Sequence, residues 1–208
     1  NLLSNFPILT YIRNSVIVVA CACFFNVVIA TLAGYAFAKK KFPFKEGIFW
    51  IYLATLMMPG QVILIPVFTI MKNMGLLNTY PSLFTVILDA FGVFLMRQFF
   101  MSLPNELLEA ARIDGLSEYG IFAKVALPLV KPGIATLVIF TFVTIWNDFM
   151  GPLIYLNSTR LKTIQLGIRM FISQYGADYA LIMAASVCSL IPVLVVFMVC
   201  QKWFVEGI

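Results

Sequence analysis

The chain has 208 residues, of which 62% are hydrophobic and only 11% are charged, with a formal net charge of +5. Soluble domains carry charges on about a quarter of their residues, so this composition excludes an ordinary water-soluble domain and indicates a membrane protein. The basic residues cluster beside long apolar runs and form no aromatic-interleaved patch, which argues against a nucleic acid as partner.

The residue types needed for most catalysis are scarce. There is no His, and the four Cys residues all lie inside apolar segments. This leaves no spacing typical of a metal site and no disulfide framework. A membrane-embedded enzyme would need clustered nucleophiles, bases or metal ligands, whereas the carboxylates here are scattered. We therefore predict no catalytic residue, no metal site and no cofactor bound by this chain.

Five apolar stretches predict membrane spans. Residues 14–38 and 47–71 each give 25 residues without a charge, enough for a helix to cross about 30 Å of hydrocarbon. Three further spans are predicted at 80–96, 127–146 and 179–201. We expect an all-α, polytopic helical bundle in which residues 1–208 form one transmembrane domain.

The first span contains a repeat of small residues. Ala30, Gly34 and Ala38 recur at intervals of four and therefore share one face of a helix. Small residues at this spacing let two helix backbones approach closely in lipid. We interpret the repeat as a packing seam and not as a ligand site.

The second span contains helix-breaking residues. The sequence MMPGQ at 57–61 and Pro66 remove backbone donors and crowd preceding carbonyls, which predicts a kink. A kink at Pro59 and Gly60 has two interpretations that the sequence leaves open. It is either fixed architecture or part of the moving wall of a solute pathway.

Three polar residues near the third and fourth spans are further candidates for the solute pathway. Asp89 lies inside the third span, where a carboxylate costs about 2.5–3.5 kcal/mol on insertion scales and must face protein or water. Asn147 and Asp148 follow Trp146 at the end of the fourth span. For Asp89, the alternatives are a role in the solute path, a structural hydrogen bond or a misplaced span edge. For Asn147 and Asp148, they are solute contact and helix termination.

The distribution of Lys and Arg predicts the orientation. Residues 39–45, KKKFPFK, hold four Lys, and short loops rich in basic residues stay in the cytoplasm. Alternation then places the segment between spans three and four in the cytoplasm as well, and the 148–178 loop outside. With five spans, Asn1 is external and Ile208 is cytoplasmic.

The segment between spans three and four is unusually polar. Residues 106–132 carry seven of the 23 charged side chains. Pro104 and Asn105 predict a helix start, Gly115 predicts a left-handed cap after two to three turns, and Ser117 can cap a second helix.

The first of these two helices is amphipathic. Its apolar side comprises Leu107, Leu108, Ala110, Ala111 and Ile113, and its charged side comprises Glu106, Glu109, Arg112 and Asp114. Small residues in the middle of the apolar side would let a partner protein approach closely. The alternative is a helix lying at the headgroup boundary, but such helices usually present Lys or Arg to anionic lipid, and this polar face is mainly acidic.

A spaced motif runs through the same segment. Glu-Ala-Ala at 109–111 is followed by Gly115 and by Val-Ala-Leu-Pro at 125–128. This motif resembles the EAA loop of the inner-membrane permease subunits of binding-protein-dependent ABC importers, with Val125 in place of the usual Ile. Other stretches resemble the carbohydrate-uptake branch, in its maltose-type or glycerol-phosphate-type second permease: MMPGQVILIPVF (57–68), FGVFLMRQFF (91–100), WNDFMGPLIY (146–155), KTIQLGI (162–168) and QKWFVEGI (201–208).

The resemblance implies a MetI-like permease fold with a cytoplasmic coupling loop at about 104–128. Such relatives have six spans with both ends in the cytoplasm, so we expect the first helix to be missing here, in agreement with a start at Asn1 and not at Met. The resemblance assigns contact with an ATPase, or the link to the fourth span, to Glu109, Ala110, Ala111, Asp114, Gly115, Leu116, Val125, Leu127 and Pro128.

The resemblance also implies partners. These are a separate ATPase subunit that uses ATP and Mg²⁺, a second permease subunit, and an extracellular or periplasmic solute-binding protein received at the 148–178 loop, all at a bacterial inner membrane. The chain itself has no phosphate-cradling loop, so we expect it to hydrolyse no ATP. The expected solute is a carbohydrate or a glycerol-phosphate-like molecule. The alternative is an ion-coupled secondary transporter, which would need intramembrane ionisable residues and repeated broken helices.

Overall fold

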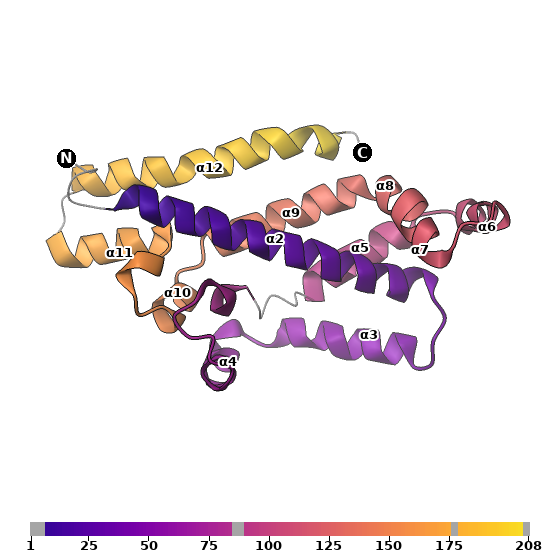
Figure 1. Ribbon diagram of the computed structural model, residues 1–208, viewed down its shortest axis with the longest axis horizontal. Helices are drawn as coiled ribbons and strands as arrows, with labels where there is room; N and C mark the ends of the chain where they lie inside the picture. The colour runs from indigo at the N-terminus through magenta and orange to yellow at the C-terminus, as the bar shows by residue number, and fades with distance from the viewer. Residues whose placement is uncertain (1–6, 85–89, 176–178, 206–208) are drawn as a thin grey trace. The chain divides into compact units, whose positions relative to one another are not determined.

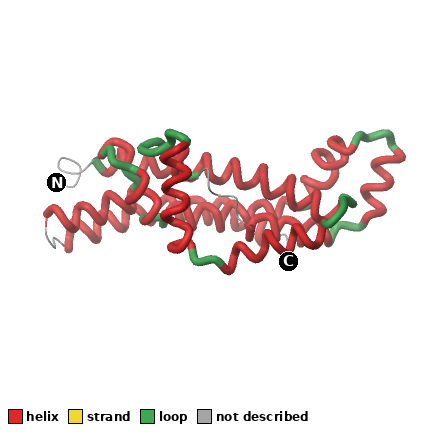
Figure 2. Tube along the Cα trace, turned by 90° about the horizontal axis from the view of Figure 1, so that it is seen from below, coloured by secondary structure: helices red, strands yellow, loops and turns green. Residues whose placement is uncertain are grey.

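The computed structural model describes residues 7–84, 90–175 and 179–205, and all the regular structure in these ranges is helical (Figures 1 and 2). The predicted all-α class is confirmed. The α-helices are α2 (Ile8–Lys39), α3 (Lys45–Ala54), α4 (Gly60–Asn73), α5 (Ala90–Met101), α6 (Asn105–Ile113), α7 (Glu118–Ile121), α8 (Leu127–Leu129), α9 (Lys131–Trp146), α10 (Met150–Tyr155), α11 (Ile164–Tyr175) and α12 (Tyr179–Val205). The 3₁₀ turns are η1 (Thr55–Met57), η2 (Tyr80–Leu83) and η4 (Thr159–Leu161), and η3 (Phe122–Ala126) is a π-helical segment.

The membrane-crossing helices are less regular than the hydropathy of the sequence predicts. Among the described residues, α2 alone is long and apolar enough to cross a membrane as one helix. The number rises to three if two bent pairs each count as one span, namely Lys45–Met57 with Gly60–Asn73 and Glu118–Leu129 with Lys131–Trp146. Two shorter apolar helices, Ala90–Met101 and Met183–Val199, cover parts of the remaining predicted spans.

The predicted second span is two helices and not one. η1 ends at Met57 and α4 begins at Gly60, so the chain breaks at Met58 and Pro59. Met58 is extended, with φ −82° and ψ 118°, the conformation that a following proline imposes by crowding the preceding backbone. The kink predicted at 57–61 is therefore a complete break, whereas Pro66 lies inside α4 without ending it.

The third and fourth predicted spans also differ from continuous helices. Residues 80–83 form the turn η2, and α5 begins at Ala90; Asp89 lies outside the described residues. In the fourth span, helix α8 stops before Val130 and α9 starts after it, with a bend of 75° between the two helical stretches. Pro132 lacks the amide that would bond to the Pro128 carbonyl, and its ring crowds that carbonyl, which accounts for the break.

The chain divides into two compact units, which we describe separately. The first unit draws on Asn1–Cys23, Gln61–Ile87 and Ile139–Val199, and the second on Phe24–Gly60, Leu88–Val138 and Cys200–Ile208.

In the first unit, a buried amide holds the loop that follows α10. Asn14, near the start of α2, is fully buried and donates hydrogen bonds from Nδ2 to the carbonyl oxygens of Arg160 and Lys162, at 2.8 and 2.9 Å. Its Oδ1 accepts a hydrogen bond from the Tyr80 hydroxyl at 2.8 Å. One side chain thus ties α2 to η2 and to the residues around η4.

In the second unit, the predicted packing seam of α2 lies against α5. A β-carbon added to Gly34 would lie 2.7 Å from Met96 Cβ and 2.9 Å from the Arg97 backbone nitrogen. Ala30 is fully buried in the same core, and Ala38 packs against it. The seam prediction is confirmed, because only small residues permit so close an approach between these two backbones.

Candidate functional site

The helix α6 ends in the glycine cap that the sequence predicts. Gly115 has φ +83°. The Leu116 amide donates to the Ala111 carbonyl at 3.1 Å, and the Gly115 amide donates to the Arg112 carbonyl at 3.1 Å. These two bonds form a Schellman motif. A β-carbon at Gly115 would meet no atom within 4 Å, so the requirement for glycine comes from the backbone conformation and not from crowding.

The faces of α6 divide its apolar residues into two sets. Leu108 and Ala111, each 6% exposed, pack into the core of the second unit. Leu107, Ala110 and Ile113 are exposed, and Ile113 retains 86% of its accessible surface. The pair Ala110 and Ala111 therefore does not form one outward surface. Ala111 anchors the helix to its own chain, whereas Ala110 faces away from it.

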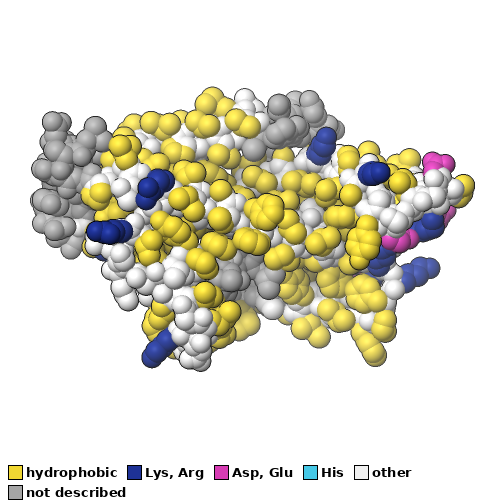
Figure 3. Space-filling view, viewed as in Figure 1, with side chains coloured by type: hydrophobic (Ala, Val, Ile, Leu, Met, Phe, Trp, Pro, Cys, Tyr) yellow, Lys and Arg dark blue, Asp and Glu magenta, His cyan; other side chains and the backbone are white. Residues whose placement is uncertain are grey.

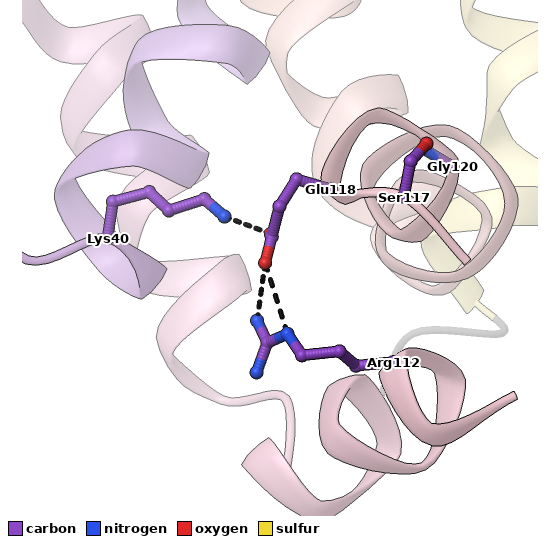
Figure 4. Close-up of polar contacts among 5 residues, drawn as sticks. All are labelled: Lys40, Arg112, Ser117, Glu118 and Gly120. Carbon is purple, nitrogen blue, oxygen red and sulfur yellow. Dashed lines mark hydrogen bonds and ion pairs between the residues drawn. The ribbon is translucent and has the colours of Figure 1, made fainter. Parts of the chain in front are cut away.

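Capping and charge fix the turn between α6 and α7. Ser117 Oγ accepts a hydrogen bond from the Gly120 amide at 3.2 Å, which confirms the predicted cap (Figure 4). The neighbouring Glu118 carboxylate accepts hydrogen bonds from Arg112 Nη2 at 2.6 Å and Nε at 3.1 Å, and it also pairs with Lys40 Nζ (Figure 4). Hydrogen bonds from Lys40 and Arg112 lower the pKa of Glu118.

The lysine loop at 39–45 contacts the same segment. Lys39 Nζ donates to the Leu103 carbonyl at 2.6 Å and to Asn105 Oδ1 at 2.8 Å, and Lys40 pairs with Glu118. Two regions predicted to lie on one side of the membrane are therefore joined directly. No local pattern predicts these contacts, since the partners are 64 to 78 positions apart.

A π-helical segment connects α7 to the fourth predicted span. In η3, Val125 is half-buried and Ala126 is fully buried; in α8, Leu127 is half-buried and Pro128 is exposed. π-helical turns are rare and frequently lie at functional sites. The residues predicted to join the loop to the fourth span thus lie where the helix changes from the π-helical η3 to the α-helical α8.

Glu109 and Asp114 are the remaining acidic members of the predicted site. Glu109 is exposed on α6, and Asp114 is exposed just after it.

Of the candidate solute-pathway residues, Pro59 and Gly60 belong to the second unit, whereas Asn147 and Asp148 belong to the first. Pro59 and Gly60 are exposed at the break before α4, and a β-carbon at Gly60 would meet no atom within 4 Å. Asp148 Oδ1 accepts a hydrogen bond from the Gly151 amide at 3.2 Å at the start of α10. Burial raises the pKa of Asp148, and hydrogen bonds from the Gly151 and Met150 amides oppose that rise. These contacts give Asp148 a structural role at the start of α10, which is neither of the two roles, solute contact and helix termination, that the sequence left open.

Asn147 lies beside a small pocket of about 220 Å³ in the first unit. Gln165 Nε2 donates to Asn147 Oδ1 at 3.3 Å. Trp146 is buried and donates from Nε1 to the Ser189 carbonyl at 3.2 Å. Gln165 and Ser189 are neighbours of Asn147 that the sequence does not predict, because nothing in their local pattern places them next to it.

Residues 26–208 match the family described as the binding-protein-dependent transport system inner membrane component. The chain belongs to this family. It is 34% identical over 200 residues to the arabinooligosaccharides transport system permease protein AraQ of Halalkalibacterium halodurans, covering 96% of this chain and 72% of that protein. It is 38% identical over 186 residues to the sn-glycerol-3-phosphate transport system permease protein UgpE of Yersinia pestis, covering 88% of this chain and 66% of that protein.

A solved structure gives the same assignment. The chain matches a bacterial ABC transporter involved in the import of the acidic polysaccharide alginate, with a TM-score of 0.83 and 26% identity over 98% of this chain and 77% of the other. The permease resemblance and the MetI-like helical bundle that the sequence predicted are thereby confirmed. The chain spans about two thirds of the glycerol-phosphate relative. As a binding-protein-dependent inner membrane component, it is a transport protein of the bilayer.

Proposed function

We propose that this chain is a membrane subunit of an ATP-driven importer and that α6 contacts a separate ATPase subunit. The outward face of α6 is the observation that carries this proposal. Leu108 and Ala111 fix the helix to the core, while Leu107, Ala110 and Ile113 are exposed. Adjacent exposed apolar side chains on an otherwise polar segment are typical of a protein contact. The small Ala110 allows a partner's surface to come close to the helix backbone.

The charges that α6 itself carries favour a protein partner, and not lipid, for its outward face. Glu109 and Asp114 are exposed and acidic, and the one basic side chain of α6, Arg112, is paired with Glu118. Anionic lipid attracts helices that present uncompensated Lys or Arg. The exposed polar face of α6 lacks them.

The proposed solute is a carbohydrate or a glycerol-phosphate-like molecule, which enters the cytoplasm. The named relatives carry arabinooligosaccharides, sn-glycerol-3-phosphate and alginate, and all three are rich in hydroxyl or acidic oxygen atoms. The pocket at Asn147 offers amide and hydroxyl groups from Gln165 and Ser189 beside the Trp146 ring. Groups of this kind bind sugar hydroxyls, so we assign Asn147 to the solute pathway.

The remaining partners follow from the same proposal. A solute pathway needs a second permease subunit facing this one, and the 148–178 loop receives the solute-binding protein on the external side. The contacts between the 39–45 loop and α6 support a common cytoplasmic location for both segments. In this orientation, the Asn1 end is external and the Ile208 end is cytoplasmic.

Uptake by proteoliposomes that contain the chain with its genomically encoded partner subunits tests this function. We expect uptake of radiolabelled arabinooligosaccharide or glycerol-3-phosphate to stop when ATP is withdrawn and to survive collapse of the proton gradient. The opposite pattern would identify the ion-coupled secondary transporter.

A variant of Ala110 tests the α6 contact itself. Ala110→Trp should abolish co-purification of the ATPase subunit, because the indole occupies the space in which the partner approaches. Ala123→Trp is the matched control, since Ala123 is also exposed but lies outside α6. Equal recruitment by both variants would count against α6 as the contact.

A further inference from the structure

A basic pocket lies between the end of α2, the 39–45 loop and α6. Its volume is about 470 Å³, within the range of roughly 300–1,000 Å³ common for small-molecule pockets. Five basic side chains line it, Lys39, Lys40, Lys41, Lys45 and Arg112, against the single carboxylate of Glu109. Figure 3 shows Lys and Arg side chains gathered near α6, at the right of the view.

Two of the five cations, Lys39 and Lys41, form no ion pair within the described residues, and the ion pair of Lys45 is long. Lys39 Nζ donates only to neutral acceptors, the Leu103 carbonyl and the Asn105 amide oxygen. Lys45 Nζ donates to the Lys40 carbonyl at 3.3 Å and lies 3.9 Å from a Glu46 oxygen. An ammonium group can donate three hydrogen bonds, so these groups retain donors for a further ligand.

Lys41 is the most available of the five. Its side chain is exposed, and within the described part of the chain it makes no hydrogen bond or ion pair. Lys40 and Arg112 differ, because both pair with Glu118. The pocket therefore combines two cations in short ion pairs, Lys45 in a long pair with Glu46, and two cations without an ion pair, Lys39 and Lys41.

The position of the pocket indicates what kind of anion it meets. It opens where the apolar α2 ends at Lys39, and Tyr35, Ala38 and Leu108 add apolar atoms to its wall. Clustered Lys residues directly beyond a membrane helix attract anionic lipid headgroups. Lys and Arg are also the side chains that bind phosphate most strongly, through charge-assisted hydrogen bonds.

We propose that this pocket binds a phosphate-bearing anion, with the headgroup of an anionic phospholipid as the expected source. This inference rests on the proposed function for the location of the pocket at the cytoplasmic membrane surface. Asn105, Glu109 and Arg112 belong to α6, whereas the Lys residues belong to α2, its following loop and α3. A bound phosphate therefore bridges the two and stabilises the position of α6.

The test uses the complete transporter in nanodiscs of phosphatidylcholine, with or without phosphatidylglycerol. Native mass spectrometry measures retained phosphatidylglycerol for the wild type and for Lys41→Gln/Lys45→Gln. A Lys near an anionic surface changes affinity about fivefold, so we expect the double variant to bind roughly 25-fold more weakly. Lys41→Arg/Lys45→Arg keeps both charges and should bind like the wild type, as should Lys131→Gln, whose exposed Lys lies outside the pocket.

A second arm distinguishes the source of the phosphate. Radiolabelled inorganic phosphate is added to transporter in phosphatidylcholine alone, and its binding is measured by equilibrium dialysis. Phosphate binding that Lys41→Gln/Lys45→Gln abolishes, without retention of phosphatidylglycerol, would support the anion site with a soluble ligand. Retention of phosphatidylglycerol with the same dependence on the variant would support the lipid headgroup.

Three outcomes would overturn the inference. These are no binding of either probe, equal weakening by Lys131→Gln, and loss of the ATPase subunit from the double glutamine variant with unchanged lipid binding. The last outcome would assign the pocket to a protein contact. Failure of ATP-dependent uptake by the wild type in both lipid mixtures would instead count against the proposed function, because binding is measured separately from uptake.

Discussion

Replacing Gly115 by valine tests the cap that ends α6. The residue at this position has φ +83°, and a left-handed conformation costs an L-residue about 1–2 kcal/mol. No atom lies within 4 Å of an added β-carbon, so overlap of this carbon adds nothing to the cost. We therefore expect Gly115→Val to destabilise the Schellman turn by about 1–2 kcal/mol, and Gly115→Asn to be tolerated, because Asn adopts this conformation more readily.

The consequence for transport follows from the same free energy. A cost of about 1–2 kcal/mol corresponds to a roughly five- to thirtyfold decrease in the equilibrium constant between the formed and the unformed turn. We expect Gly115→Val to lower both co-purification of the ATPase subunit and ATP-dependent uptake, and Gly115→Asn to stay close to wild type. Gly47→Val is the matched control, since Gly47 lies in α3 with open space around it and no positive φ.

Two results would refute this reasoning. Wild-type recruitment and uptake by Gly115→Val would show that the cap does not hold α6 in its functional position. Equal damage from Gly115→Asn and Gly115→Val would show that the position rejects any side chain. In that case, a contact with the partner subunit, and not the backbone conformation, would explain the glycine.

Three further substitutions test the packing. Gly34→Ala places a β-carbon 2.7 Å from a side chain on α5, so it should lower unfolding stability in detergent by about 1–3 kcal/mol, whereas Gly47→Ala should not. Glu118→Gln removes two largely exposed ion pairs and should lower the free energy of unfolding by less than about 1 kcal/mol. High salt should reduce this difference further. A larger loss of stability that does not depend on salt would contradict exposed ion pairing. Trp146→Phe removes the indole donor to Ser189, which should cost about 0.5–1.5 kcal/mol, and the cavity left by the smaller ring in the core adds to this cost. An unchanged unfolding midpoint would contradict that role.

The features that the sequence predicted correctly are local. Gly115 and Ser117 act on backbone groups within five residues of themselves, so their residue types alone indicate a helix end and a helix start. The small-residue repeat containing Gly34 is also readable, because helical periodicity places its members on one face. In each case, the signal and the structure it specifies lie in the same short stretch.

The features that the sequence could not predict depend on partners distant in the chain. Asn14 bonds to carbonyls 146 and 148 positions away, and no local pattern indicates which loop its amide reaches. Hydropathy likewise depends only on how many residues are apolar, and it does not show whether the backbone hydrogen bonds of a helix continue without a break. It therefore gave single spans where the chain breaks at Pro59 and at Val130. The division of α6 into a buried and an exposed apolar stripe also required knowing which neighbours cover it.

The contacts of α6 differ in how well they could transmit a displacement. Its links to Lys40 through Glu118 are exposed ion pairs, and such pairs contribute about 0–1 kcal/mol each. By contrast, Leu108 and Ala111 are buried in the core, where side chains pack as closely as in organic crystals and pass strain to their neighbours. Leu108 and Ala111 share this core with Tyr35 of α2 and Met96 of α5, so a displacement of α6 would strain its packing against both helices. The hydrogen bond from Lys39 to Asn105 and the ion pairs of Glu118 are the polar links between this turn and the end of α2.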